Sequence, residues 1–332
     1  MRTNVPKARS IALAFAVLLA EPVAAAERVS MAVPGIPPVF AGVVAYVAKE
    51  EGFFKKYGVD VEVRPFDSGA AAAQAVVSGN IDVSLSPTPV IVRMVSNAGV
   101  DLVGIYGMAH PDWLLASSEP NVKCPDLKGQ PIGVDSVGGA RAVALAAFLR
   151  PCGLTVDNVK LVSLSSNVGA AMVAKQIKIG VLHTDDVPVL EEQLGKKLTI
   201  VSTFNQVSPV SHYNLIVCTK KGLEQKRDAY TRVIAGLIDA TGYMKDPKNA
   251  DQVARIAKVT GRSEQIAKQA LPHFLEIKYW PYEDDGLGKA NLERTIATEK
   301  ELGGIKPGKT PVAYEQLVDR TVWKGAEALR KK

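Results

Sequence analysis

Aromatic residues and cysteines are scarce in this chain. Only 6% of its 332 residues are Phe, Trp or Tyr, and it has three cysteines and four histidines. So few rings argue against a pocket built from several stacked aromatic side chains. No Cys-x-x-Cys pair occurs, which argues against a thiol redox site or a zinc site. Since three is an odd number, at least one of Cys124, Cys152 and Cys218 has no intramolecular disulfide partner, and the sequence leaves the pairing open.

Long apolar runs, a strong charge and common enzyme motifs are also missing. After residue 26 no stretch of about 18 apolar residues occurs, which argues against a membrane-spanning helix. The net charge of +6 is spread along the chain and gives no reason to expect a nucleic-acid partner. His-Glu-x-x-His, Gly-x-Ser-x-Gly and Walker-loop motifs are absent. The length and the 47% hydrophobic content predict a soluble globular protein of two domains.

The first 26 residues have the three-part layout of a secretory signal peptide. Arg2, Lys7 and Arg9 form a basic start, residues 11–20 are apolar, and residues 24–26 are alanines suited to a signal peptidase. We expect cleavage after residue 26 and a free, soluble, monomeric protein in the periplasm. Cleavage removes three basic residues and one acidic residue, so the net charge falls from +6 to +4.

Strands and helices are predicted to alternate in two successive units. In the first unit, Val29, Met31 and Val33 alternate with polar or small residues, as strand residues do. Further strands are expected at 59–63, 81–85 and 100–106, with helices at 39–51 and 70–78 and from residue 87. In the second unit, strands are expected at 132–134, 159–164 and 179–182, with helices at 140–150 and 170–176. Such alternation implies parallel sheets covered by helices.

The order of these units predicts an α/β fold with two lobes. The apolar runs 113–117 and 213–219 flank the second unit, and we expect the chain to cross between the lobes there. Helices expected at 223–245, 250–260, 263–274 and 284–302 would form a C-terminal helical part packed on the first lobe. The prediction is therefore lobe 1 from residues 27–112 and 219–332, and lobe 2 from residues 113–218.

Four predicted strand-to-helix turns carry groups suited to binding an anion. In open parallel sheets, ligands bind beyond the carboxyl ends of the strands, where helix N-termini present free N–H groups. The same residue types are also preferred simply as helix caps and turns, so each turn keeps a purely structural alternative. The turns are Ser68-Gly69, Ser86-Pro87-Thr88, residues 136–141 and residues 165–167.

Several stretches are similar to one family of transport receptors. They are residues 48–62 (AKEEGFFKKYGVDVE), Ser68-Gly69, residues 77–83 (VSGNIDV) and residues 126–134 (DLKGQPIGV). These resemble the substrate-binding proteins of ABC importers for nitrate, aliphatic sulfonates, taurine and thiamine pyrimidine precursors, over about residues 30–245. In the second lobe, Lys175-Gln176-Ile177-Lys178 replaces the family's Gly-x-Ile-Asp motif, and the effect on the geometry near His183 is left open.

The resemblance implies a type II periplasmic binding fold and a receptor that performs no chemistry. Such a receptor holds a small solute, here a sulfonate, carboxylate or similar anion, in the interlobe cleft and delivers it to a membrane permease driven by an ATPase. The alternative is an exported or biosynthetic enzyme on the same fold, such as the related pyrimidine synthases. Those synthases carry a cysteine-rich motif, which this chain lacks. A scaffold or interaction protein would not need four such turns facing one cleft.

Individual side chains keep more than one interpretation each. Arg141 can pair with an oxyanion through two N–H groups, or lie solvated on a helix face. Trp113 and Phe40 can stack on an organic solute, or pack in the core or the hinge. His183, followed by Thr184-Asp185-Asp186, can hold a metal or act as an acid–base group, line the cleft, or lie on a surface loop.

We expect no catalytic residue, no metal and no cofactor. The predicted ligand contacts are Phe40, Ser68, Gly69, Ser86, Thr88, Trp113, Ser136, Gly138, Gly139, Arg141, Asn167 and His183.

Overall fold

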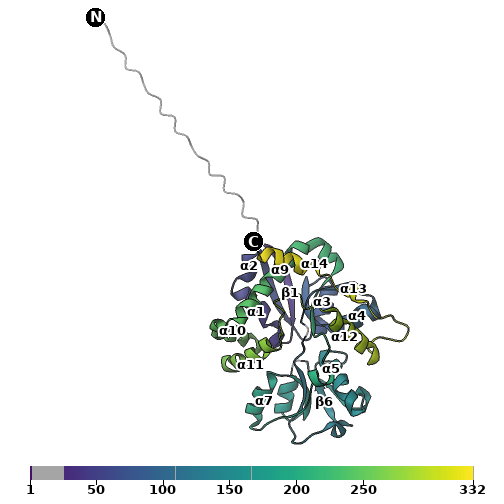
Figure 1. Ribbon diagram of the computed structural model, residues 1–332. Coiled ribbons are helices and arrows are strands. Elements are labelled where there is room, and N and C mark those ends of the chain that lie inside the picture. The colour runs from purple at the N-terminus through teal and green to yellow at the C-terminus, as the bar shows by residue number, and fades with distance from the viewer. Residues whose placement is uncertain (2–25, 109, 166, 332) are drawn as a thin grey trace.

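The computed structural model describes residues 1, 26–108, 110–165 and 167–331. The predicted signal peptide, residues 1–26, therefore lies outside the described residues except at its two ends. The other described residues form two α/β lobes, one above the other in Figure 1, each built on its own five-stranded sheet. Among the described residues, no helix has both the length and the apolar character needed to cross a membrane.

The first lobe contains a mixed sheet with strand order β2-β1-β3-β10-β4. β1 pairs in parallel with β2 and β3, while β10 runs antiparallel between β3 and β4. The strands are β1 (Glu27–Pro34), β2 (Val59–Phe66), β3 (Val83–Pro87), β4 (Leu102–Met108) and β10 (Asn214–Thr219). The helices between them are η1 (Phe40–Gly42), α1 (Val43–Glu50), α2 (Phe53–Lys56), α3 (Gly69–Val77) and α4 (Thr88–Ala98).

The second lobe repeats the plan with strand order β7-β6-β8-β5-β9. Here β5 is the antiparallel strand, between β8 and β9. The strands are β5 (Trp113–Ser117), β6 (Pro131–Val134), β7 (Lys160–Ser163), β8 (Ile179–His183) and β9 (Thr199–Thr203). The helices are η2 (Cys124–Leu127), α5 (Ala140–Leu149), η3 (Arg150–Cys152), η4 (Val156–Asn158), α6 (Val168–Val173), α7 (Asp186–Leu194) and α8 (Phe204–Val207). The sequence pattern did not predict α7, β9 or α8.

The two crossings between the lobes lie next to the predicted crossing strands and not along them. The chain passes between the sheets in the segments that join β4 to β5 and β9 to β10, and each of β5 and β10 lies within one sheet. Residues 214–218, predicted in lobe 2, pair with β3 and β4 of the first sheet. Residues Asn214 to Cys218 are buried because β10 is an inner strand of that sheet. We therefore propose that lobe 2 ends before Asn214.

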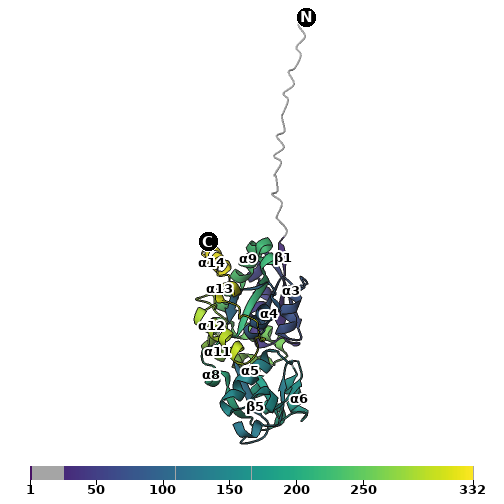
Figure 2. The same ribbon diagram turned by 90° about the vertical axis from the view of Figure 1, so that its right-hand side faces the viewer.

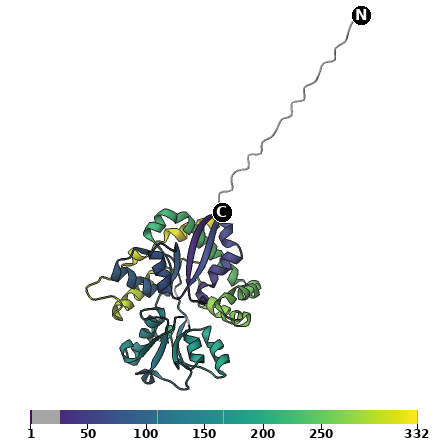
Figure 3. The same ribbon diagram turned by 180° about the vertical axis from the view of Figure 1, so that it is seen from behind.

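The C-terminal helices lie mainly around the first lobe, while the second lobe is covered by helices of its own (Figures 2 and 3). The long α9 packs on α1 and α2, α14 packs on α9, and α12 packs on α4. The helix predicted at 284–302 begins only at Lys289, because Gly286 has a left-handed φ of 64° and Asp284 accepts its N–H. The helices are α9 (Lys220–Lys245), η5 (Pro247–Asn249), α10 (Ala250–Ala257), η6 (Lys258–Thr260), α11 (Glu264–Glu276), α12 (Lys289–Glu301), α13 (Tyr314–Leu317) and α14 (Thr321–Arg330).

The stretches that resemble the transport receptors have clear structural roles. Asp82, at the end of the run 77–83, accepts hydrogen bonds from the Ser30 backbone N–H (2.8 Å) and from Lys226 Nζ (2.7 Å). In the second lobe, Lys175 has a left-handed φ of 59°, close to the 77° of Gly79 at the corresponding turn. The replaced motif thus keeps a left-handed turn before strand β8, and β8 continues regularly to His183.

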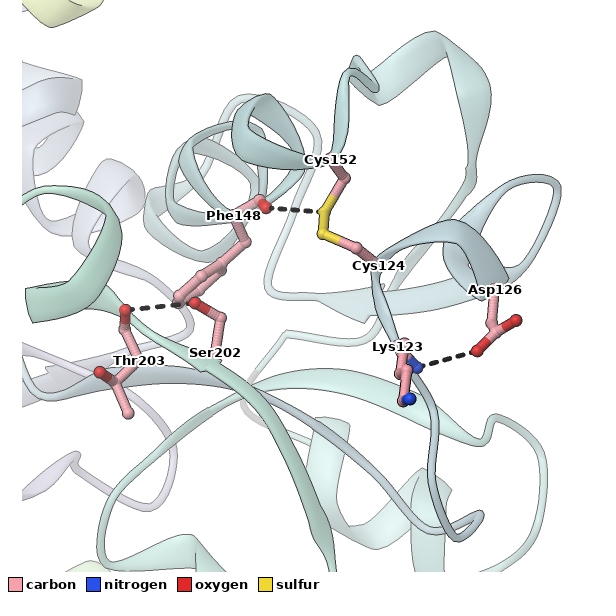
Figure 4. The surroundings of a disulfide bond; sticks show 7 residues. All are labelled: Lys123, Cys124, Asp126, Phe148, Cys152, Ser202 and Thr203. Carbon is pink, nitrogen blue, oxygen red and sulfur yellow. Dashed lines mark hydrogen bonds between the residues drawn. A yellow bond between two sulfur atoms is a disulfide. The ribbon is translucent and has the colours of Figure 1, made fainter.

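One pair of cysteines forms a disulfide. Cys124 in η2 is bonded to Cys152 in η3, which ties the entry of the second lobe to the end of α5 (Figure 4). Beside it, Asp126 accepts a hydrogen bond from the Lys123 backbone N–H (2.9 Å). Cys218 is the unpaired cysteine and is buried in β10, where burial raises the pKa of its thiol.

Candidate functional site

A cleft of about 200 Å³ lies between the two lobes, with a smaller recess of about 40 Å³ next to it. The first lobe contributes the segment 37–40 and Arg262, and the second contributes Arg141, Asn167 and His183. Arg141 and His183 line both the cleft and the recess. A space of this size fits a small solute rather than a peptide.

Arg141 is the most conspicuous donor in this cleft. It lies in the first turn of α5, and its side chain is only 5% exposed, so it is not a solvated helix-face arginine. Its guanidinium lies over the Trp113 ring, with Cζ 5.5 Å from the ring centroid, and its Nη2 is 4.0 Å from Asp186 Oδ2. Its Nη1 is buried and has no hydrogen-bond partner in the part of the chain that the structure describes. A buried guanidinium N–H without an acceptor lowers the stability of the fold, so Nη1 is suited to donate a hydrogen bond to a ligand oxygen.

His183 is held by a carboxylate from the first crossing segment. Its Nδ1 lies 2.9 Å from Oδ1 and 3.1 Å from Oδ2 of Asp112, and the Tyr279 hydroxyl donates to Asp112 Oδ1 at 3.0 Å. The imidazole ring lies over Trp113 with centroids 4.0 Å apart. His183 Nε2 is buried and, within the described chain, also has no hydrogen-bond partner. Arg141 Nη1 and His183 Nε2 are thus two unused polar atoms in one cleft.

Arg262 joins the two lobes across the mouth of the cleft. This residue precedes α11 in the first lobe, and its Nε donates to Asp185 Oδ2 in the second lobe at 2.9 Å. Its Nη2 donates to Asp186 Oδ1. Asp186 also accepts the His183 backbone N–H at 2.9 Å, which fixes the turn after β8. One guanidinium therefore neutralises both acidic residues of this turn.

The surroundings shift the pKa values of these acids in opposite directions. Burial alone would raise the pKa of Asp186, but Arg262 and Arg141 outweigh it and lower the pKa. Burial and the neighbouring Asp186 raise the pKa of Asp185, although Arg262 acts against them.

Asp112, His183 and Asp185 also place ligand atoms within 4.8 Å of one another, a spacing that suits a metal ion. Within this cluster Asp185 is already paired with Arg262, and Asp112 with His183.

Aromatic rings form one wall of the recess. Trp113 and Tyr213 both line it, with ring centroids 5.7 Å apart. Phe40 lines the cleft, but its ring is stacked on Phe274 with centroids 4.5 Å apart and is 2% exposed. Phe40 therefore serves mainly as core packing, while Trp113 and Tyr213 remain as the apolar wall.

The predicted turn residues of the first lobe divide into two groups. Ser68 and Gly69 line the recess, and the Ser68 hydroxyl caps α3 by accepting the Ala71 N–H. Ser86 and Thr88 do not appear in the lining of either space, and both are fully buried. The Ser86 hydroxyl donates to the Gly69 carbonyl oxygen at 3.0 Å. The Thr88 hydroxyl bonds to His212 Nδ1 at 2.7 Å. These two hydroxyls have partners inside the lobe.

The predicted turn residues of the second lobe also divide into two groups. Asn167 lines the cleft at the start of α6 with its side chain exposed. Ser136, Gly138 and Gly139 lie at the entry to α5 but do not line the two spaces. A Cβ on Gly138 would lie 3.9 Å from Nη1 of Arg93 in the first lobe. This turn therefore lies at the contact between the lobes.

The polar residues of the site that sequence reasoning missed include Asp112, Arg262 and Asn214. Asp112 and Arg262 lie in irregular segments next to no motif, so only tertiary structure brings them to His183 and Asp185. Asn214, at the start of β10, lines the recess, and both polar atoms of its side chain are buried without a hydrogen bond to the described chain. The one available signal was Asn214 itself, a polar residue opening an apolar strand.

Comparison with known proteins gives the family. The model of a family described as NMT1/THI5 like matches residues 38–250, well over half of the chain. The chain belongs to the NMT1/THI5-like family. The resemblance drawn from residues 48–62 and 77–83 is thereby confirmed.

Individual relatives are distant in sequence. A Brucella abortus protein, described only as a binding protein, is 22% identical over 252 residues, covering 75% of this chain and 78% of its own length. A Haemophilus influenzae protein described as a thiamine biosynthesis protein is 24% identical over 251 residues, covering 73% of this chain and 76% of its own length.

Solved structures share the fold of this NMT1/THI5-like chain. The periplasmic nitrate-binding protein of Synechocystis PCC 6803 superposes with a TM-score of 0.76 at 13% identity, covering 92% of this chain and 89% of its own. The alkanesulfonate-binding protein of Xanthomonas axonopodis pv. citri, bound to MOPS, has a TM-score of 0.70 at 15% identity, covering 88% and 98%. The predicted periplasmic binding protein fold is therefore confirmed.

Proposed function

We propose that this protein is the solute receptor of an ABC importer and binds a small organic anion, such as a sulfonate or carboxylate, between its lobes. The observation that carries the proposal is the buried Arg141 Nη1 without a partner in the described chain. Such a donor is best satisfied by a negatively charged oxygen, which guanidinium binds strongly. The apolar wall of Trp113 and Tyr213 fits the organic part of the solute.

The rest of the proposal concerns location and partners. Residues 1–26 direct export, and the mature chain works in the periplasm as a monomer that delivers solute to a permease in the inner membrane. The family and the fold of the nitrate-binding and alkanesulfonate-binding proteins support this role. In this reading the protein binds its solute and turns nothing over.

A second candidate is an enzyme that forms or modifies a pyrimidine on the same fold. The Haemophilus influenzae relative favours it by its description, and the buried Asp112–His183 pair is an arrangement that acid–base catalysis also uses. Against it, the cysteines lie far apart in the sequence and two of them form a disulfide.

A thermal-shift screen of the mature protein tests the proposal. The panel contains alkanesulfonates, carboxylates, nitrate and pyrimidines, each checked for conversion by mass spectrometry. A solute at 100 times its dissociation constant should stabilise the fold by about 2.7 kcal/mol and be recovered unchanged. Conversion of a pyrimidine would favour the enzyme instead, and stabilisation by neutral pyrimidines alone would contradict the anionic solute.

A further inference from the structure

We propose that Asp112 keeps His183 protonated when the cleft is filled, so that the anion is held by two N–H donors and binding takes up one proton. The donors are Arg141 Nη1 and His183 Nε2. This inference rests on the proposed binding of an anion and adds the charge state in which the site binds it. Asp112 acts here as a positioning residue, because it acts through His183.

The hydrogen-bond geometry decides which nitrogen of His183 is free. Both carboxylate oxygens of Asp112 lie within 3.1 Å of Nδ1, and a carboxylate at this position is satisfied by an N–H donor. The Tyr279 hydroxyl holds Asp112 Oδ1 from the other side, and the side chains of all three residues are buried. Nδ1 therefore carries a proton, and Nε2 is the atom whose protonation is open.

The neighbourhood of Nε2 favours the protonated form when an anion binds. Neutral His183 would offer Nε2 as an acceptor, in a recess whose lining also includes the donor Arg141. A carboxylate or sulfonate oxygen can only accept hydrogen bonds. It would therefore give neutral Nε2 no donor, and the lone pairs of the two atoms would repel each other. Imidazolium removes the conflict, because Nε2 then donates to the same anionic group. Asp112 supplies the counter-charge on the opposite side of the ring.

The charged groups that act on His183 come from four segments, and Asp67 and Asp135 also line the recess with it. Arg141 on α5 and Arg262 before α11 are positive, while Asp112 on the crossing segment and Asp186 after β8 are acids, with Asp185 beside them. Tyr279, after α11, is held neutral because burial and Asp112 raise its pKa far above the ordinary value. Burial and Arg141 lower the pKa of His183, but Asp112 and Asp186 outweigh them, and the net direction is upward.

Proton uptake has a measurable consequence for affinity. If binding requires the imidazolium, then by linkage the bound anion raises the pKa of His183 further. The affinity for the anion then falls as the pH rises through the pKa that His183 has in the solute-free protein. The fall reaches about tenfold per pH unit for one proton. A site that used only Arg141 would show flat affinity over the same pH range.

The first test needs no solute. The chain has only four histidines, so the ring nitrogens can be followed by ¹⁵N NMR on the mature protein between pH 5 and 9. His183→Gln assigns the signal, and His273→Gln, an exposed residue on α11, is the matched control. We expect the Nδ1–H form of His183 with a pKa above 6.5. An Nε2–H form, or a pKa below 6.5, would overturn the inference.

The second test uses ethanesulfonate, which does not titrate in this range, and calorimetry in two buffers with different ionisation enthalpies. Wild-type protein above the His183 pKa should take up one proton per ethanesulfonate bound. Asp112→Asn should shift the fall in affinity by at least about one unit toward lower pH, and His183→Gln should make the profile flat. Asp239→Asn, a carboxylate paired with Lys56 and Arg330 outside the cleft, should leave the profile unchanged.

The outcomes separate this inference from the proposed function. Ethanesulfonate binding with no proton uptake and a flat wild-type profile would overturn the role of Asp112 and leave the receptor role standing. If ethanesulfonate and the other anions of the screen all fail to bind, the proposed function fails. In that case the NMR measurement still decides whether Asp112 sets the protonation of His183.

Discussion

Arg262 Nε lies 2.9 Å from Asp185 Oδ2, and this contact joins the first lobe to the second across the mouth of the binding cleft. The same guanidinium also reaches Asp186, so two acids of one lobe depend on one cation of the other. Both acids have largely buried side chains. Removing the cation from such a pair leaves buried negative charge without compensation. The pairing of Arg262 with these two acids therefore stabilises the contact between the lobes in the absence of solute.

Arg262→Gln is expected to open the cleft in solute-free protein. Asp185 and Asp186 would then gain hydration by moving apart from the first lobe, since burying an unpaired charge costs several kcal/mol. Small-angle scattering should show a larger radius of gyration than for wild type. Arg255→Gln, an arginine of α10 in the same helical part, is the control. An unchanged radius in Arg262→Gln would show that other contacts hold the lobes closed.

Thr88→Ala is expected to lower stability and leave solute affinity unchanged. From the sequence, Thr88 was expected to contact the anion. The structure instead directs its hydroxyl to Nδ1 of buried His212, whose Nε2 donates to the Gly286 carbonyl oxygen at 2.7 Å. Leaving His212 Nδ1 without its donor should cost about 1–3 kcal/mol in urea unfolding. Weaker binding at unchanged stability would instead support the predicted contact of Thr88 with the anion.

The same histidine predicts a loss of stability in acid. Burial lowers the pKa of His212 from 6.5 to about 4, so it is neutral in the folded chain where it is already protonated in the unfolded chain. Its contribution is complete above pH 6.5 and disappears as pH falls toward 4. The difference amounts to about 3 kcal/mol. Urea unfolding of wild type and His212→Gln across this range measures it, and equal pH slopes would contradict the prediction.

Reduction of the disulfide is expected to destabilise the second lobe. Cys124 and Cys152 are 28 residues apart, and closing a loop of this length contributes about 3–4 kcal/mol in the chain-entropy model. Reducing agent should lower the melting temperature of wild type. The double variant Cys124→Ala/Cys152→Ala should melt low from the start and be insensitive to reductant. An equal melting temperature of oxidised and fully reduced wild-type protein would contradict this prediction.

The fold could be predicted because its determinants are local. Alternation such as Val29, Met31 and Val33, and helix starts such as Ser68 before residues 69–77, signal their structures within a few residues. β9 and α7 were missed because β9 is a half-exposed edge strand and α7 buries only Leu190 along its length. Weak burial leaves weak hydrophobic periodicity, which is the signal used for prediction.

The candidate site could be predicted only in part. Arg141, Trp113 and His183 follow or flank predicted strands, so the rule for strand ends finds them. Asp112 and Arg262 come from irregular segments, and their positions depend on how the lobes pack. The same rule failed to separate residues that line the cleft from Thr88, whose hydroxyl is taken by His212 from a distant segment. Hydrogen bonds between residues far apart in the chain cannot be predicted from a single sequence.

The most direct test of the account compares wild type with Arg141→Gln by titration calorimetry, using the best anion of the thermal screen. A hydrogen bond to a charged group contributes about 1.5–3 kcal/mol, so the variant should bind about 10 to 150 times more weakly. Arg64→Gln, an exposed arginine on β2 of the first lobe, should bind like wild type. Equal affinity of Arg141→Gln and wild type, with both folded, would contradict the assignment of the interlobe cleft as an anion site.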